Sequence, residues 1–209
     1  MTTYNFIKEC AKGTNDPSFN VTNAQEWREL IEFQASELFP EIAIEGSYSI
    51  VYTDISNYEV DLSVSTYDNV ENVKEILLET ANGDRVSYDN WIYNKETKRL
   101  DLDPETSKVP DYDPSTYINV IIVTNESLPA LTSDSTDIDL KSAELILLKK
   151  VCIKEAIRRI LLDHTKLDRY RTLVGRTNEY ALLGIIRDLT LEIERGKAKL
   201  TNTNSVRTF

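Results

Sequence analysis

The chain has 209 residues, of which 41% are hydrophobic and 28% charged, proportions that are ordinary for a globular protein able to bury a core. Its net charge of −11 argues against a dedicated nucleic-acid-binding protein, because phosphate binding needs a basic surface. No stretch approaches the roughly 20 apolar residues of a membrane helix, and the N-terminus lacks the pattern of a signal peptide, so an intracellular, soluble protein is expected.

Two helices are predicted near the N-terminus. The first covers residues 4–12. Thr22 or Asn23 can cap the second, with the side chain three residues on, Gln25 or Glu26, completing a capping box.

From residue 47 the pattern changes to short segments rich in β-branched and aromatic residues, which are typical of strands. Residues 47–53 and 58–66 are two such segments. A hairpin is predicted around Asn82-Gly83, a pair that suits a type I′ turn, and a second hairpin turns at residues 95–97. Residues 117–124 are almost continuously apolar, which predicts a central strand. The hairpins indicate a mainly antiparallel unit of five to seven strands.

A linker of small polar residues and aspartates is predicted over residues 128–140. The longest helix then starts at Asp137 or Asp139 and covers residues 141–170, and Gly175 breaks it. Its two apolar stripes make a band wider than one neighbour needs. We therefore expect this helix to be buried on two sides or to lie at an interface.

The last predicted helix covers residues 178–195 and ends at Gly196. Its apolar face consists of Leu182, Ile185, Leu189 and Ile193. The tail beyond it is polar, basic and unpatterned, so it is expected to be disordered unless a partner holds it.

The sequence thus predicts an α+β fold built from chain segments far apart in sequence. Residues 1–45 and 136–196 form one helical body, which contains the long C-terminal helices. An antiparallel β unit of residues 46–135 is inserted into it, and residues 197–209 form an extended C-terminal tail.

Charge is distributed unevenly along this layout. Residues 1–140 hold 9 Lys+Arg against 27 Asp+Glu, a net charge of −18, whereas residues 141–209 hold 15 against 8, a net charge of +7. Opposite patches on one small protein favour head-to-tail contact between copies or with a larger partner.

The residues that carry chemistry do not form a recognisable catalytic pattern, and no enzyme activity or cofactor is predicted. The single histidine, His164 beside Asp163, lacks a nucleophile or oxyanion signature. One histidine and two distant cysteines are too few for a zinc site. Cys10 and Cys152 are expected to be reduced core thiols, with a disulfide between them as the alternative.

An acidic loop at residues 101–113 begins like a calcium-binding loop, with Asp101, Asp103 and Glu105. Thr106 and Tyr112 stand where an EF-hand needs Gly and Glu, which excludes that motif. A looser divalent-ion site and a solvated acidic loop both remain as interpretations.

The layout as a whole resembles the head-to-tail adaptor (neck or connector) proteins of tailed bacteriophages. A helix with Trp27 precedes a strand-rich insert, and the strand YINVIIVT leads through SLPALTSDSTDIDL into the long helix. A break rich in Tyr and Arg, LDRYRTLVGRTNEYALL, precedes the final amphipathic helix and the loose tail. The resemblance covers most of the chain and rests on order and spacing.

This resemblance implies a structural protein of the virion neck, assembled in the host cytoplasm. Twelve copies would form a ring beneath the portal protein and extend the DNA channel toward a downstream tail or neck protein. An acidic channel wall repels phosphate, so DNA would pass without specific binding, although an acidic surface kept for solubility explains the same excess. No membrane contact is expected.

Contacts with the portal and between subunits are expected from the basic part of the chain. The basic residues of the long helix are also compatible with an ordinary solvent-exposed helix face. The residues expected to make these contacts are Lys149, Lys150, Lys154, Arg158, Arg159, Lys197, Lys199, Arg207 and Phe209. The alternative function is a tail-associated β module that binds carbohydrate or protein, suggested by the 11 tyrosines.

Overall fold

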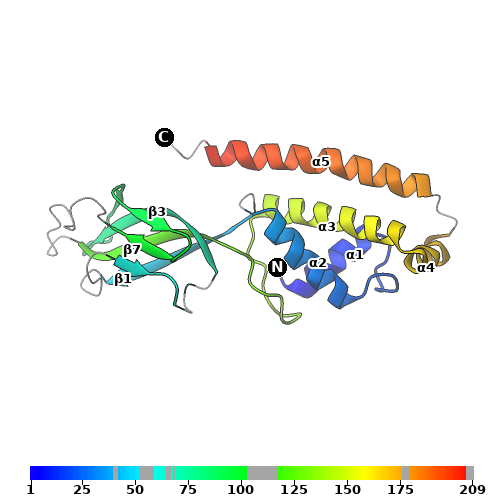
Figure 1. The fold of residues 1–209 in the computed structure, drawn as a ribbon, viewed down its shortest axis with the longest axis horizontal. Coiled ribbons are helices and arrows are strands. Elements are labelled where there is room, and N and C mark those ends of the chain that lie inside the picture. The colour runs from blue at the N-terminus through cyan, green and yellow to red at the C-terminus, as the bar shows by residue number, and fades with distance from the viewer. Residues whose placement is uncertain are drawn as a thin grey trace. The chain divides into compact units, whose positions relative to one another are not determined.

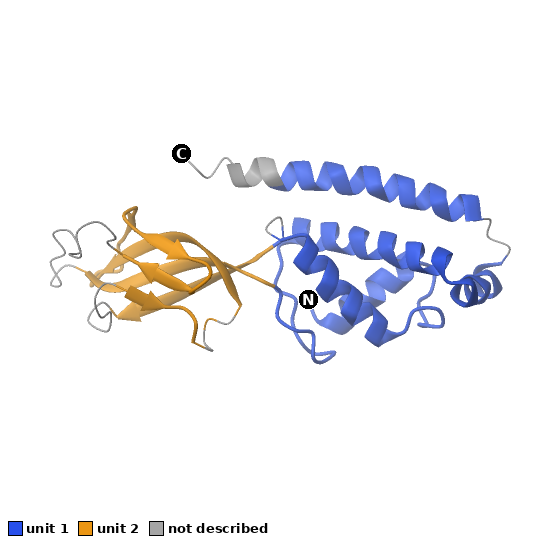
Figure 2. Cartoon of the chain, in the orientation of Figure 1, with its two compact units in different colours: residues 1–42, 128–209 blue, residues 43–127 orange. Residues whose placement is uncertain are grey.

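A computed structural model of the chain describes residues 1–39, 42–51, 59–64, 67, 69–102, 117–175 and 179–205, the side chains of 201–205 excepted (Figure 1). The chain folds into two compact units (Figure 2). The helical unit comprises Met1–Ile42 and Leu128–Phe209, and the β unit comprises Ala43–Ser127. The predicted α+β fold, with an antiparallel β unit inserted between helical segments, is confirmed.

The N-terminal helices are α1 (Thr3–Gly13) and α2 (Ala24–Glu37). The predicted capping box is present at the start of α2. The Asn23 side chain accepts a hydrogen bond from the Glu26 backbone N–H at 2.9 Å, and the Asn23 N–H donates to Glu26 Oε2 at 3.0 Å. Two backbone N–H groups at the N-terminal end of the helix, those of Asn23 and Glu26, are thereby satisfied, which fixes where α2 begins.

The turn between α1 and α2 is organised by a carboxylate that is fully buried. Asp16 has 0% exposure and accepts three hydrogen bonds from backbone N–H groups. Its partners, at 2.8, 2.8 and 3.1 Å, are Asn20, Val21 and Thr22. A side chain thus supplies the acceptors that the irregular backbone lacks.

Residues 128–140 belong to the helical unit and are not the free linker that the sequence predicts. The Thr3 N–H donates to the Thr136 carbonyl at 2.8 Å, and the Leu131 N–H donates to Glu32 Oε1 at 2.5 Å. Leu131 and Ile138 are buried. The β unit covers Ala43–Ser127 and not the predicted 46–135, and these contacts with α1 and α2 show why residues 128–135 belong to the helical unit.

The predicted long helix is divided into α3 (Ser142–Leu162) and α4 (His164–Val174). Between them Asp163 is extended, with φ −111° and ψ 107°, and its carboxylate caps α4 through the N–H groups of Thr165 and Lys166. The start also differs from the prediction. The helix begins after Lys141, whose N–H donates to Glu144 Oε2 at 2.8 Å, and not at an aspartate cap.

The wide apolar band on α3 is largely buried on two sides, which is one of the two outcomes expected from its sequence, although Ile146 of the band is 55% exposed. Helices α1 and α2 pack against one side, and α5 (Glu179–Ser205) lies along the other (Figure 1). Buried side chains on α3 include Leu147, Leu148, Cys152 and Ile157. This helix therefore forms the centre of the helical unit.

Helix α5 continues through Gly196, so the prediction that this residue ends the helix is wrong. A Cβ at Gly196 would lie 3.2 Å from Leu147 Cδ1, which shows that the glycine lets α5 approach α3 closely. Residues 197–205 are helical and not an extended tail, while 206–209 lie outside the described residues. On the predicted face, Leu182 and Ile193 are buried, but Ile185 is 40% exposed.

The β unit consists of two antiparallel sheets. The first has the order β1 (Ile44–Val51), β7 (Tyr117–Glu126), β3 (Val70–Thr80), β4 (Arg85–Tyr88), and the second the order β2 (Glu59–Asp61), β6 (Arg99–Asp101), β5 (Ile92–Asn94). The described part of the unit thus has seven strands, and β7 is central as predicted. Both sheets contribute side chains to one core, including Val60, Leu100, Ile76 and Ile122.

The hairpin between β3 and β4 is present, but its turn is not type I′. Of the pair Asn82-Gly83, only Gly83 has a positive φ, of 85°. The Thr80 N–H donates to the Asp84 carbonyl and the Gly83 N–H to the Thr80 carbonyl, both at 2.9 Å. This pattern fits a three-residue loop, in which a type I turn is followed by a left-handed glycine.

The first residues of the β unit are locked to its last residues around the Glu126 carboxylate. Tyr48 Oη donates to Glu126 Oε1 at 2.5 Å, and Thr124 Oγ1 donates to the same oxygen at 3.1 Å. Burial and this carboxylate together raise the pKa of Tyr48. Gly46 leaves the space that the carboxylate fills, since a Cβ there would lie 1.7 Å from Glu126 Oε1.

Candidate functional site

Two of the basic residues expected to contact partners are engaged within the helical unit. Lys149 Nζ lies 3.2 Å from Glu9 Oε2 on α1, and Lys150 Nζ lies 2.9 Å from Glu192 Oε2 on α5. Each ion pair is partly exposed, so its contribution to stability is small, on the order of 0–1 kcal/mol. These lysines tie α1 and α5 to α3.

Of the other basic residues of α3, Arg158 and Arg159 are exposed and Lys154 is half-buried. Arg158 and Arg159 each have a nitrogen 3.7 Å from a Glu155 oxygen, at i,i+3 and i,i+4 spacing. Lys154 is half-buried and makes no ion pair with the described residues. This part of the row is an exposed helix face with internal charge pairing.

The C-terminal candidates are only partly described. Lys197 is half-buried and Lys199 exposed, and both lie on the last turns of α5. Arg207 and Phe209 lie outside the described residues. The structure therefore brings Lys150 and Lys199 to one place, described below, and leaves the remaining candidates dispersed.

The ion pairs lower the pKa values of the carboxyl groups that link the helices. At Glu26, burial raises the pKa, but the hydrogen bonds from Lys166 and from the Asn23 N–H outweigh it and bring the pKa below the ordinary 4.5. The Lys166 Nζ–Glu26 Oε1 distance is 2.6 Å. At Glu192 the hydrogen bond from Lys150 has the same effect.

Folding cancels the charge polarity of the sequence within the helical unit. The acidic N-terminal helices and residues 128–140 pack against the basic C-terminal helices, through pairs such as Glu9–Lys149 and Glu26–Lys166. The segments of the helical unit together hold 18 Lys+Arg and 18 Asp+Glu, a net charge of zero. The β unit holds 6 against 17, so it carries the whole net charge of −11.

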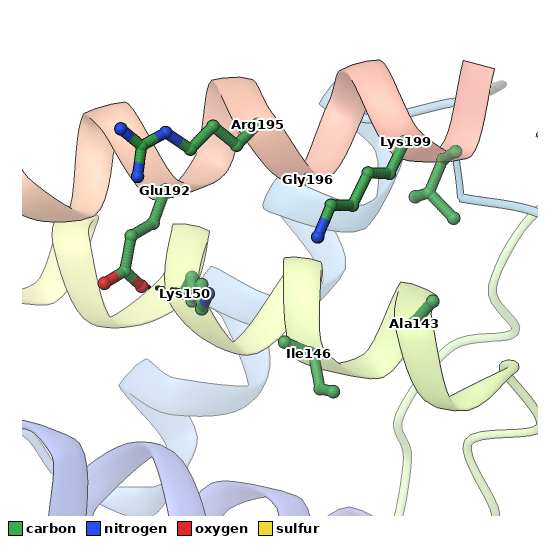
Figure 3. A pocket seen from close by; sticks show the side chains of 8 residues that line it. Ala143, Ile146, Lys150, Glu192, Arg195, Gly196 and Lys199 are labelled. Atoms are coloured by element: carbon green, nitrogen blue, oxygen red, sulfur yellow. Dashed lines mark ion pairs between the residues drawn. The ribbon is translucent and has the colours of Figure 1, made fainter. Parts of the chain in front are cut away.

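A hollow of about 370 Å³ lies between the first half of α3 and the last turns of α5 (Figure 3). Its volume is at the low end of ligand pockets. Apolar side chains and a glycine form part of the lining, and three cations and one carboxylate form the rest. The lining residues are Ala143, Ile146, Leu200, Gly196, Lys150, Arg195, Lys199 and Glu192.

Ile146 is an exposed apolar residue at the centre of this region, with 55% of its surface exposed. Besides the hollow against α5, it lines a second one of about 230 Å³ against α1. Met1, Phe6 and Leu145 also line the second hollow. The side chain is thus a ridge between two depressions.

Exposed apolar side chains also occur on the segments at the opposite end of α3. Gly196 lies beside Leu147 and Glu192 beside Lys150, so α5 runs antiparallel to α3 and its first turns are level with Leu162. The exposed residues here come from the ends of α3 and α4 and the start of α5. We call these residues the apolar end, after the segments that carry them; they are Leu162 (75% exposed), Leu173 (43%), Val174 (37%), Tyr180 (79%) and Leu183 (52%).

Sequence reasoning missed the apolar end because it assigned one apolar face to the last helix. A second set of apolar residues on that helix was the available signal, since Tyr180, Leu183 and Leu191 lie off the face that packs on α3. Exposed apolar side chains that gather at one place mark interaction surfaces more often than isolated ones do.

Five of the tyrosines that suggested a binding module pack into the β unit. Tyr48, Tyr67, Tyr88, Tyr93 and Tyr117 are partly buried and pack against the core of the β unit. The rings of Tyr48 and Tyr67 meet edge to face, with centroids 4.7 Å apart. This edge-to-face pair stabilises the β unit.

Residues with potential chemistry do not converge in the described part of the chain. His164 is exposed at the first turn of α4. Cys10 and Cys152 are free thiols with 0% exposure, so the predicted reduced core thiols are confirmed and the disulfide is not formed. Burial raises the pKa of Cys10 to about 12 and that of Cys152 well above its usual range.

Within the same described residues, no group of three or more potential ligands could hold a metal ion. Asp101 ends β6, while Asp103 and Glu105 of the acidic loop fall outside the described ranges. Among the helices described, none combines the length and hydropathy needed to cross a membrane.

A scan against protein-family models finds no match for this chain, and a search of curated proteins finds none either.

Proposed function

We propose that the protein is a structural ring subunit of a tailed-phage neck, a head-to-tail adaptor that binds beneath the portal and extends the DNA channel toward the tail. The observation that carries this proposal is that the helical unit exposes apolar side chains in two places, in the hollow beside Ile146 and around Leu162. Exposed apolar side chains on neighbouring segments are a feature of proteins that bind partners, when they form a contiguous patch. The order of elements in the sequence supports the same function.

The charge distribution supports the proposal in a second way. The helical unit is neutral overall, so copies of it can pack side by side without net repulsion. The β unit carries −11, a charge that would repel DNA phosphate wherever the two meet. An acidic surface kept only for solubility would give the same charge. The exposed apolar side chains of the helical unit therefore support the proposed function more strongly than the charge of the β unit does.

The test is the mass of the complex that the full chain forms with the purified portal protein of its source phage, measured by native mass spectrometry and electron microscopy. The proposal predicts a ring of copies bound to the portal. If neither a ring nor a portal complex forms at any concentration or salt, the proposal is wrong.

Two truncations sharpen this test because of where α5 ends. Removal of residues 206–209 spares the helix, whereas removal of 197–209 also takes away Lys199 and Leu200, which line the hollow. Loss of portal binding only with the longer truncation would assign the contact to the hollow. Loss with both would assign it to the last four residues.

A further inference from the structure

The three-stranded sheet of the β unit turns two rows of side chains away from the core. Its middle row, Val60, Leu100 and Tyr93, packs inward. Side chains alternate between the two faces of a strand, so the rows on either side of the middle row point outward. We call these two rows the outer face; its residues are Ile92, Asp101 and Glu59 in one row and Asn94, Arg99 and Asp61 in the other.

Ile92 is the apolar side chain of the outer face, and it is 58% exposed. Its cross-strand neighbour on β6 is Asp101, whose own neighbour on β2 is Glu59. Side chains directly opposite each other have Cβ atoms about 4.5–5.5 Å apart, so both carboxylates lie within about 10 Å of the isoleucine. The register of the strands thus places an exposed apolar side chain and two acidic groups in one contiguous row.

The outer face as a whole is acidic. It holds three carboxylates, those of Glu59, Asp61 and Asp101, against one guanidinium, that of Arg99, which lies 3.7 Å from Glu59. The two lysines of the turn at residues 95–98 lie at the other end of the β5–β6 hairpin from the isoleucine. This face belongs to the unit that carries the whole net charge of −11.

The hollow between α3 and α5 has the opposite charge. Its charged lining consists of three cations and one carboxylate, those of Lys150, Arg195, Lys199 and Glu192 (Figure 3). Ile146 lies one helical turn before Lys150, and such positions have Cβ atoms about 5–6 Å apart. An apolar side chain with cations beside it on α3 and α5 therefore matches the isoleucine with carboxylates beside it on the outer face.

We infer that the outer face of one copy docks on the hollow of a second copy, with Ile92 against Ile146 and the carboxylates of the outer face toward the cations of the hollow. A second copy is the favoured partner because this chain carries both surfaces and they are complementary in charge. The contact joins two different surfaces and is heterologous, so each copy keeps one surface open for the next. Repetition gives a closed ring where the rotation closes. The inference rests on the proposed ring and names a contact that would build it.

The first test is a cross-linking experiment on the full chain with single-cysteine additions. Ile92→Cys and Ile146→Cys are each prepared, mixed, and treated with a short bismaleimide, alone and in the presence of portal protein. The native Cys10 and Cys152 have 0% exposure and do not compete for the reagent in the folded protein. Val86→Cys replaces Ile92→Cys in the matched control mixture, because this valine of β4 is 47% exposed and lies opposite an uncharged leucine of β3.

The expected result is a covalent dimer in the mixture of Ile92→Cys and Ile146→Cys, in several-fold higher yield than in the control mixture or in either variant alone. Cross-linking of Ile92→Cys to itself as efficiently as in the mixture would mean an isologous contact and overturn the inference. A mixture yield no higher than that of the control, with and without portal, would overturn it too.

Exchange of charges tests the electrostatic half of the contact. Glu59→Lys on the Ile92→Cys chain, or Lys199→Glu on the Ile146→Cys chain, should each lower the dimer yield several-fold. The two changes together should restore it, because a cation and a carboxylate then face each other again. A yield that neither single change alters, or that does not recover in the combination, would contradict the contact.

A last measurement keeps the contact and the function apart. Ile92→Lys should lower the mass of any assembly to that of the monomer, while Val86→Lys should leave it unchanged, with the circular dichroism of both variants intact. Rings on the portal that survive Ile92→Lys would leave the proposed function standing and refute this contact. Self-association that depends on Ile92, without any portal binding, would do the reverse.

Discussion

Asp16 should be the residue outside the apolar core whose replacement costs the helical unit most stability. Its carboxylate has 0% exposure and is the acceptor for the buried N–H groups of Val21 and Thr22 and for the partly buried N–H of Asn20. In Asp16→Ala two buried donors lose their partner, at about 1–3 kcal/mol each, so the free energy of unfolding should fall by about 2–6 kcal/mol. That is a large fraction of the roughly 5–15 kcal/mol typical of a domain.

The two tryptophans provide a unit-specific assay, because Trp27 lies in the core of the helical unit and Trp91 packs against that of the β unit. In a Trp91→Phe background, urea titrations followed by Trp27 fluorescence report the helical unit alone. Asp16→Asn keeps one acceptor oxygen and should give a smaller loss, and the exposed Asp188→Ala should give almost none. If Asp16→Ala unfolds at the same urea concentration as Asp188→Ala, the role assigned to this carboxylate is wrong.

Three further predictions concern the stability of the β unit, the reactivity of the two thiols and the loss of stability at acid pH. Gly46→Ala should destabilise the β unit by about 1–3 kcal/mol, since the new Cβ would displace the Glu126 carboxylate from the hydrogen bonds that Tyr48 and Thr124 donate to it; Trp91 fluorescence in urea measures this, and an unchanged midpoint would contradict it. Cys10 and Cys152 should resist thiol reagents at pH 8 until the helical unit unfolds, because both are buried and the pKa of Cys10 is raised to about 12; rapid labelling of native protein would argue against this packing. The lowered pKa of Glu26 stabilises the fold above the ordinary value of 4.5, and this contribution should be lost as pH falls below it; Glu26→Gln should remove that part of the acid dependence of the urea midpoint, and an identical pH profile for wild type and variant would count against it.

Local rules predicted the parts of the fold that local interactions decide. The start of α2 follows from the reciprocal hydrogen bonds of Asn23 and Glu26, which need nothing beyond four consecutive residues. The central position of β7 agrees with its nearly continuous apolar pattern, because apolar side chains on both faces of a strand are typical of strands in the interior of a sheet.

Tertiary contacts decided the parts that were missed. The sequence predicts a helix end at Gly196, since a glycine inside a helix costs about 1 kcal/mol relative to alanine. Its place against Leu147 on α3 makes it an approach point inside a longer helix. The break at Asp163 has no glycine or proline to mark it, and its only signal is a side chain able to cap the next helix.

The charge distribution along the sequence did not predict where the charges would lie in the fold. The sequence places acidic and basic residues at opposite ends of the chain, which favours contact between copies. Pairs such as Lys149–Glu9 instead form within one helical unit, because the fold brings the two chain ends together. The helical unit still exposes apolar side chains to a partner, in the hollow beside Ile146 and at Leu162.

The most direct test of a ring built from this helical unit is the mass distribution of the full-length protein mixed with the portal of its source phage, determined by native mass spectrometry. The proposed ring predicts one dominant complex in which a closed ring of copies is bound to the portal. A protein that stays monomeric beside the portal at every concentration and salt would contradict it.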